Sequence, residues 1–159
     1  MRNAIWHASG VLLAPVAAAC GIATARAAVK AVPLIVPASE SISGESFRIS
    51  PSDVDGVTCL RLPGGVTAIV LTVASGGTAG DVNWAIYVKG KGPLRVGLVR
   101  GGYKLSLGRI GSDIVETDPV YKKNDPNCCP TGGFDHTQWR WTGTKWAVAK
   151  TWHNKTYNP

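Results

Sequence analysis

The chain has 159 residues, a formal net charge of +7 and an apolar fraction of 45% against 17% charged residues. This length and composition predict one globular domain and exclude wholesale disorder. Glycine and proline, at 19 and 10 residues, make the chain rich in turns without making it low in complexity. No apolar run in the sequence approaches the roughly 18 residues of a membrane-spanning helix.

Residues 1–27 have the three parts of a secretory signal peptide. Arg2 supplies a positive start, residues 11–19 form a short apolar stretch, and Ala25-Arg26-Ala27 offers small residues where the signal peptidase reads them. We therefore expect cleavage after Ala27, so that the mature chain begins near Ala28.

A second interpretation of the same segment stays open. Residues 17–21 read Ala-Ala-Ala-Cys-Gly, which is similar to a bacterial lipobox. In that case Cys20 would be lipidated, and the lipid would be the chain's attachment to a membrane. An uncleaved anchor is the remaining alternative.

The rest of the chain is predicted to be all-β. Residues 28–50 resemble an extended lead-in with one short strand near 47–49, and residues 51–159 form a single β domain. Apolar residues that alternate or run continuously between turns predict an antiparallel meander of about seven short strands. They lie at 66–74, 82–88, 94–98, 103–107, 113–117, 138–141 and 145–152, with Gly101-Gly102 as a turn.

This meander suits a sandwich, an open barrel or a strongly twisted sheet. We expect one apolar face and one polar face that carries Lys89, Arg95 and Lys104. No helix is predicted after the signal peptide (residues 1–27), which we also call the leader.

Cleavage after Ala27 would leave three of the four cysteines, Cys59, Cys128 and Cys129. An exported protein meets oxidising conditions, and adjacent cysteines bond to each other only through a strained ring. We therefore expect Cys59 to pair with Cys128 or Cys129, with one thiol left over. Such a bridge closes a loop of about 70 residues and stabilises the fold by roughly 4 kcal/mol.

Residues 118–133 contain Pro-Val-Tyr followed by Asp-Pro-Asn-Cys-Cys-Pro-Thr-Gly-Gly, and residues 140–146 read Arg-Trp-Thr-Gly-Thr-Lys-Trp. This arrangement resembles secreted and lipoprotein domains of the actinobacterial LppP/LprE type. The resemblance covers residues 66–148. It implies an exported, envelope-associated β domain and no established catalytic activity.

The simplest role of this cysteine-containing stretch is a disulfide-linked connection between strands. Two kinds of chemistry are alternatives to it. Cys128 or Cys129 would be a nucleophile if His136 acted as its base, with Asp135 or Asp125 orienting it. Zinc would need ligands from among Cys59, Cys128, Cys129, His136 and His153, which lack the usual spacing. The stretch 53–56 lacks most ligands of a calcium loop and is predicted to be a polar turn. We expect no catalytic residues, metal or cofactor.

Tryptophans concentrate near the C-terminus. Trp139, Trp141, Trp146 and Trp152 would form an aromatic binding surface if exposed, and part of the core if buried.

The sequence thus predicts a secreted or cell-envelope β domain that is non-catalytic. Its positive charge suits an envelope polymer, an anionic lipid surface or a protein partner. No nucleic-acid motif is present, so we expect no nucleic acid partner. The alternative function is a secreted enzyme with a reactive cysteine.

Overall fold

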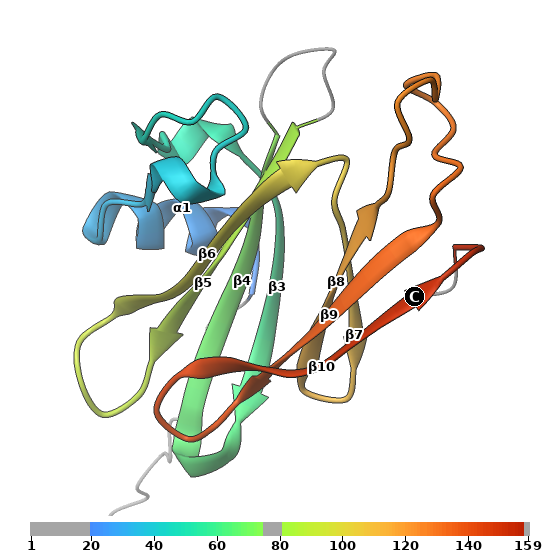
Figure 1. Cartoon of the computed structure of the whole chain (residues 1–159). Coiled ribbons are helices and arrows are strands. Elements are labelled where there is room, and N and C mark those ends of the chain that lie inside the picture. The colour runs from blue at the N-terminus through green and yellow to red at the C-terminus, as the bar shows by residue number, and fades with distance from the viewer. Residues whose placement is uncertain (1–19, 75–80, 158–159) are drawn as a thin grey trace, which may run out of the picture.

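The computed structural model describes residues 20–74 and 81–157, and Figure 1 shows how their elements are arranged. The first part holds helix α1 (Ile22–Ala31), strands β1 (Ile35–Val36) and β2 (Phe47–Arg48), and the short 3-10 helices η1 (Ala38–Glu40), η2 (Pro51–Asp53) and η3 (Pro63–Gly65). The longer strands are β3 (Val54–Leu62), β4 (Val66–Ala74), β5 (Asp81–Lys89), β6 (Arg95–Tyr103), β7 (Ser106–Ile110), β8 (Asp113–Pro119), β9 (Phe134–Trp141) and β10 (Trp146–Asn154).

These longer strands form two four-stranded antiparallel sheets. The first sheet has the order β3-β4-β5-β6 and the second sheet the order β10-β9-β8-β7, while β1 and β2 pair separately. Every neighbour in each sheet is also the next strand along the chain, so both sheets are meanders. The predicted all-β antiparallel fold is confirmed, in its sandwich form.

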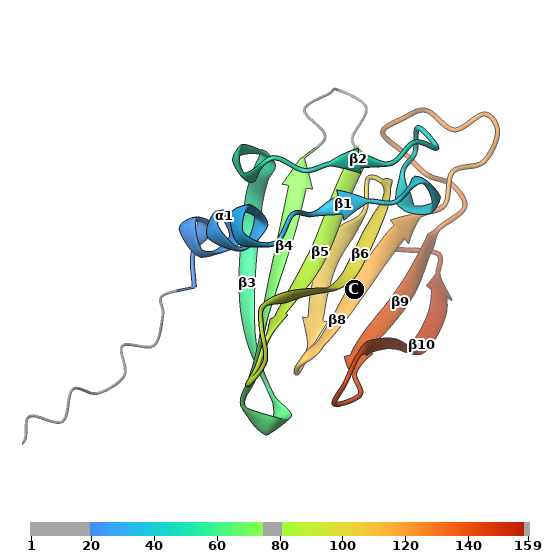
Figure 2. The same ribbon diagram turned by 90° about the vertical axis from the view of Figure 1, so that its left-hand side faces the viewer.

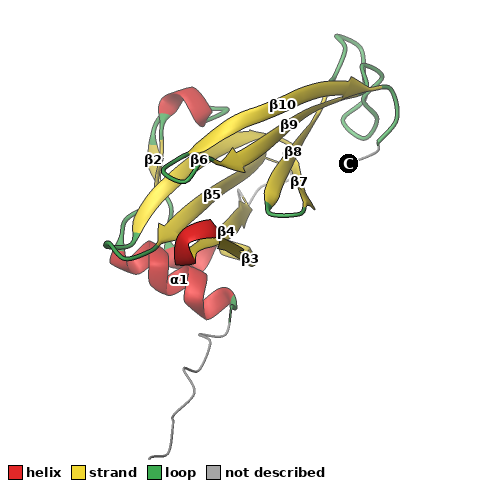
Figure 3. Cartoon of the chain, turned by 90° about the horizontal axis from the view of Figure 1, so that it is seen from below, coloured by secondary structure: helices red, strands yellow, loops and turns green. Residues whose placement is uncertain are grey.

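The first sheet is the middle of three layers. Figures 2 and 3 show α1 and the β1-β2 ribbon on one of its faces and the second sheet on the other. This explains the continuous apolar run of β4, because a strand covered on both faces has no polar side. Ile69 and Leu71 face the helix, whereas Ala68 and Val70 face the second sheet.

Two hydrophobic clusters fill the spaces between the layers. The outer cluster joins α1 and the ribbon to the first sheet, through Ala25, Ala28, Val29, Leu34, Val36, Ile49, Val54, Ile69, Leu71, Val73, Ala85 and Tyr87. The inner cluster joins the two sheets, through Leu60, Leu62, Ala68, Val70, Trp84, Ile86, Val88, Leu105, Ile114 and Trp146.

Several expectations about elements need correction. No helix was predicted after residue 27, but α1 continues to Ala31, and residues 28–50 contribute to the layer that packs on the first sheet. Strand β3 begins at Val54, inside the stretch 53–56 predicted to be a turn. A wholly polar sheet face is also wrong for the first sheet, because its second face is covered by these N-terminal elements.

Gly101 and Gly102 lie inside β6, and the chain turns after Tyr103 instead. The physical reason for Gly101 is close approach. A Cβ atom at this position would lie 2.1 Å from the carbonyl oxygen of Glu40, in the 3-10 helix η1 that crosses this edge. The glycine therefore marks contact with another segment rather than a reversal of the chain.

In the part of the chain that the structure describes, no helix has the length and apolarity needed to cross a membrane.

Candidate functional site

The loop 120–133, which we call the Cys-Cys-Pro loop, joins β8 to β9 and is held in one shape by hydrogen bonds. The carboxylate of Asp125 accepts hydrogen bonds from the amide of Lys122 and from the amide and hydroxyl of Thr131, each at 2.7 Å. These bonds to the charged form lower the pKa of Asp125. At the base of the loop, the Val120 amide donates to the Gly133 carbonyl at 2.8 Å.

The loop also docks on the β6-β7 turn. Tyr121 donates its hydroxyl to the Asn127 carbonyl at 2.9 Å, and the ammonium of Lys104 donates to the same oxygen. The rings of Tyr103 and Tyr121 meet edge to face, with their centroids 5.3 Å apart. These contacts hold the exposed residues 127–129 of the loop in place.

The cysteines pair differently from the expected arrangement. Cys128 is bonded to Cys129, Cys20 is bonded to Cys59, and no described cysteine is free. The reason lies in the layers. Cys59 packs against the outer cluster on the helix side of the first sheet, whereas the Cys-Cys-Pro loop leaves the second sheet, on the opposite side. The start of α1 brings Cys20 within 5.8 Å of Cys59, measured between Cα atoms.

The four tryptophans considered as an aromatic binding surface do not lie on a single face. Trp146 is 5% exposed, and Trp139 and Trp141 are partly buried against the inner cluster. Trp152 pairs with His136 across β9 and β10, on the opposite face of the second sheet from Trp139. Three of the four therefore contribute to the packing between the sheets.

The contacts of His136 are with Thr117 and Trp152, not with the cysteines for which it was considered as a general base. Its side chain is buried on β9, where Nδ1 lies 2.9 Å from the hydroxyl of Thr117 and the ring stacks on Trp152 with centroids 4.8 Å apart. Burial lowers the pKa of His136. Asp135 instead lies 2.7 Å from Nδ1 of His153. No group of three or more possible metal ligands gathers among residues 20–74 and 81–157.

A buried charge cluster, not anticipated from the sequence, joins the layers. Glu116 is fully buried and accepts hydrogen bonds from the indole of Trp84 at 2.6 Å and from Arg100 at 2.9 Å. Arg100 also reaches Glu40 in η1 at 2.7 Å and lies over the ring of Trp139. Strand β8 also contains Asp113 and Asp118, so no sequence signal singles out Glu116 as the buried carboxylate. Its partners are protein groups, so the cluster acts as a structural clamp.

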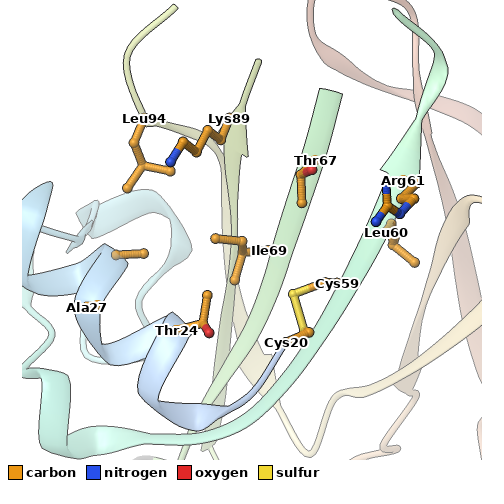
Figure 4. Close-up of a pocket in the computed structure, with 11 residues that line it drawn as sticks. Cys20, Thr24, Ala27, Cys59, Leu60, Arg61, Thr67, Ile69, Lys89 and Leu94 are labelled. Atoms are coloured by element: carbon orange, nitrogen blue, oxygen red, sulfur yellow. A yellow bond between two sulfur atoms is a disulfide. The ribbon is translucent and has the colours of Figure 1, made fainter. Parts of the chain in front are cut away.

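The structure also contains a groove beside the Cys20–Cys59 disulfide, with a volume of about 780 Å³ (Figure 4). Thr24, Ala27 and Ala28 of α1 line one side of the groove, and Leu94 lies near Lys89 at its upper end in Figure 4. The floor is the helix-side face of the first sheet beside α1, with Cys59 and Arg61 on β3, Thr67 and Ile69 on β4 and Lys89 on β5.

The charges at this groove have one sign. Arg61 and Lys89 are both exposed, and neither forms an ion pair with a described residue. None of the described residues that line the groove is acidic. Lys89 was predicted to lie on a polar face, whereas Arg61 had no predicted role, because the proximity of the two residues follows from the pairing of β3, β4 and β5.

The groove thus combines apolar side chains with two positive charges that have no ion-pair partner among the described residues, and it is the candidate binding site. Comparisons with protein-family models, with curated proteins and with solved structures find no match to this chain.

Proposed function

We propose that the protein is an exported, non-catalytic domain of the cell envelope or extracellular space that binds a fatty acid in the groove beside Cys20–Cys59. The observation that carries the proposal is the groove itself, which is lined by apolar side chains together with the cationic Arg61 and Lys89.

The size and lining of the groove suit an alkyl chain. Its volume of about 780 Å³ lies within the usual range for small-ligand sites. Ala27, Ala28, Ile69 and Leu94 offer apolar surface to a chain that leaves water on binding. These side chains come from α1, from β4 and from the residue that precedes β6, and all three segments pack in or against the outer cluster.

The charges suit a carboxylate head group. A guanidinium presents donors in a fork that matches two carboxylate oxygens, and an ammonium adds a compact positive charge. Because Arg61 and Lys89 have no acidic partner among the described residues, an anionic ligand would not have to displace one.

The disulfides support export. Cys20–Cys59 and Cys128–Cys129 account for all the cysteines, and disulfides persist chiefly outside the reducing cytoplasm. The same pairing weighs against the alternative enzyme, because its nucleophile would be Cys128 or Cys129 as a thiolate.

Binding is tested by calorimetric titration of the oxidised protein with laurate at a concentration below its micelle threshold. We expect saturable binding of laurate and no comparable binding of dodecyltrimethylammonium, which has the same chain and the opposite charge. The double variant Arg61→Gln/Lys89→Gln should weaken laurate binding at least tenfold, which corresponds to about 1.4 kcal/mol.

The matched control is Lys91→Gln/Lys123→Gln, which removes two exposed lysines that do not line the groove. This control should bind laurate as the wild type does. Equal losses in both double variants would mean that net charge, not the groove, attracts the ligand. Absence of laurate binding in the wild type would overturn the proposed ligand.

A further inference from the structure

The packing of α1 bears on where the leader ends. Ala25, Ala28 and Val29 are 0%, 4% and 3% exposed and belong to the outer cluster. The segment is also tied to the first sheet by polar contacts. Arg26 donates to the Val54 carbonyl at 3.3 Å, and the hydroxyl of Tyr87 donates to the Val32 carbonyl at 2.7 Å.

Cleavage after Ala27 would remove much of this layer. It would cut within α1 and separate Ala25 and Arg26 from their partners on the first sheet. It would also remove Cys20 and leave Cys59 without the sulfur to which it is bonded. Apolar surface on the helix side of the sheet, around Ile69, would then face water.

The sequence offers a second cleavage point that avoids these losses. Ala17 and Ala19 are small residues at the two positions before the bond that the signal peptidase reads, as Ala25 and Ala27 are in the first candidate site. Cleavage after Ala19 keeps the whole of α1 and makes Cys20 the first residue.

We propose that the leader is removed after Ala19 and that the thiol of Cys20 then forms a disulfide with Cys59 rather than becoming lipidated. Water hydrolyses the Ala19–Cys20 peptide bond, which releases a carboxylate on Ala19 and an amino group on Cys20. The two thiols lose their protons and pass two electrons to a disulfide-bearing oxidant of the exporting compartment, which is reduced to a dithiol.

This cleavage has a consequence for the groove. Cys20 lines it, so the new ammonium group at Cys20 adds a positive charge beside those of Arg61 and Lys89. Maturation would thereby complete the site for an anionic ligand. This inference rests on the export part of the proposed function and not on the identity of the ligand.

The test is an intact mass of the exported full-length gene product, alkylated with iodoacetamide without reduction. We expect a chain that starts at Cys20, carries no added alkyl group, and gains four of them after reduction. Cys59→Ser should expose one alkylatable thiol, which peptide mapping should place at Cys20.

Two variants of the chain test whether the cleaved peptide bond is Ala19–Cys20. Ala19→Arg should block processing, whereas Ala27→Arg, an exposed position in α1, should leave the start at Cys20. A chain that starts at Ala28, or one with a diacylglyceryl group on Cys20, would overturn the proposal while leaving export intact. Unprocessed protein confined to the cytoplasm would instead overturn export itself.

Discussion

At the scale of the residue, the clamp around Glu116 shows how one buried charge is made tolerable. Its carboxylate is out of contact with water but accepts hydrogen bonds from Trp84 and Arg100. Removal of one partner from such a pair leaves the other charge buried and uncompensated, which costs more than the pair itself contributes.

Glu116→Ala should lower the free energy of unfolding by about 3–5 kcal/mol, because Arg100 would keep only Glu40 as an ion-pair partner. Glu116→Gln should lose less, since an amide oxygen still accepts from the Trp84 indole. Urea denaturation measures the free energy of unfolding of both variants. The control is Glu45→Gln, because Glu45 is an exposed carboxylate. A loss in Glu116→Ala as small as in that control would refute the clamp.

Asp118 gives stability a distinctive pH dependence. Burial, with the negative charge of Glu116, raises the pKa of Asp118 to about 6, against about 3.9 in an unfolded chain. The folded protein therefore holds this proton more tightly, so the contribution of Asp118 to stability is fully present below pH 4 and is lost as the pH rises through 6.

Asp118→Asn cannot titrate, so its unfolding free energy should fall less than that of the wild type between pH 4 and pH 6. The difference between the two proteins, measured by urea denaturation across this range, isolates Asp118 from the other carboxylates. Parallel curves for wild type and variant would contradict the raised pKa.

At the scale of the element, the two disulfides differ in what they connect. Cys20–Cys59 spans 39 residues and ties α1 to β3, whereas Cys128–Cys129 joins neighbours in one loop. A crosslink stabilises chiefly by restricting the unfolded chain, and the effect grows with the length of the closed loop.

The double variant Cys20→Ser/Cys59→Ser should therefore lose about 4 kcal/mol of stability. The variant Cys128→Ser/Cys129→Ser should lose less than about 1 kcal/mol, because almost no loop is opened. Guanidinium denaturation under non-reducing conditions compares them. Similar losses in the two variants would show that the loop disulfide supports structure beyond its own turn.

At the scale of the whole molecule, the N-terminal layer lies on a sheet whose other face is already covered. Its fit depends on the close approach of η1 to β6 at Gly101. A side chain at that position would push the two segments apart, because the nearest atom is a backbone oxygen rather than a movable side chain.

Gly101→Ala should therefore destabilise the fold by about 1–3 kcal/mol and make residues 32–50 more sensitive to limited proteolysis. Gly92→Ala is the matched control, since a Cβ there meets nothing within 4 Å. Equal proteolysis of the two variants would count against Gly101 as the contact that seats this layer.

Local patterns alone were enough to predict most of the sheet content. The span 66–74 matches β4 residue for residue, and the alternating stretches at 82–88 and 113–117 fall within β5 and β8. These strands could be predicted because their apolar pattern and bounding turns are local properties. Strand β3 was missed because its polar and apolar residues alternate irregularly around Gly56, where its register with β4 shifts.

Other features were decided only by the tertiary structure. The pairing of Cys20 with Cys59, the burial of α1 and the gathering of Arg61 and Lys89 at one groove each join segments distant in the sequence. The sequence by itself determined the all-β class, since this class arises from alternating apolar residues that lie near one another. Which segments meet was decided by the burial of both faces of one sheet, a non-local property that no stretch of residues carries alone.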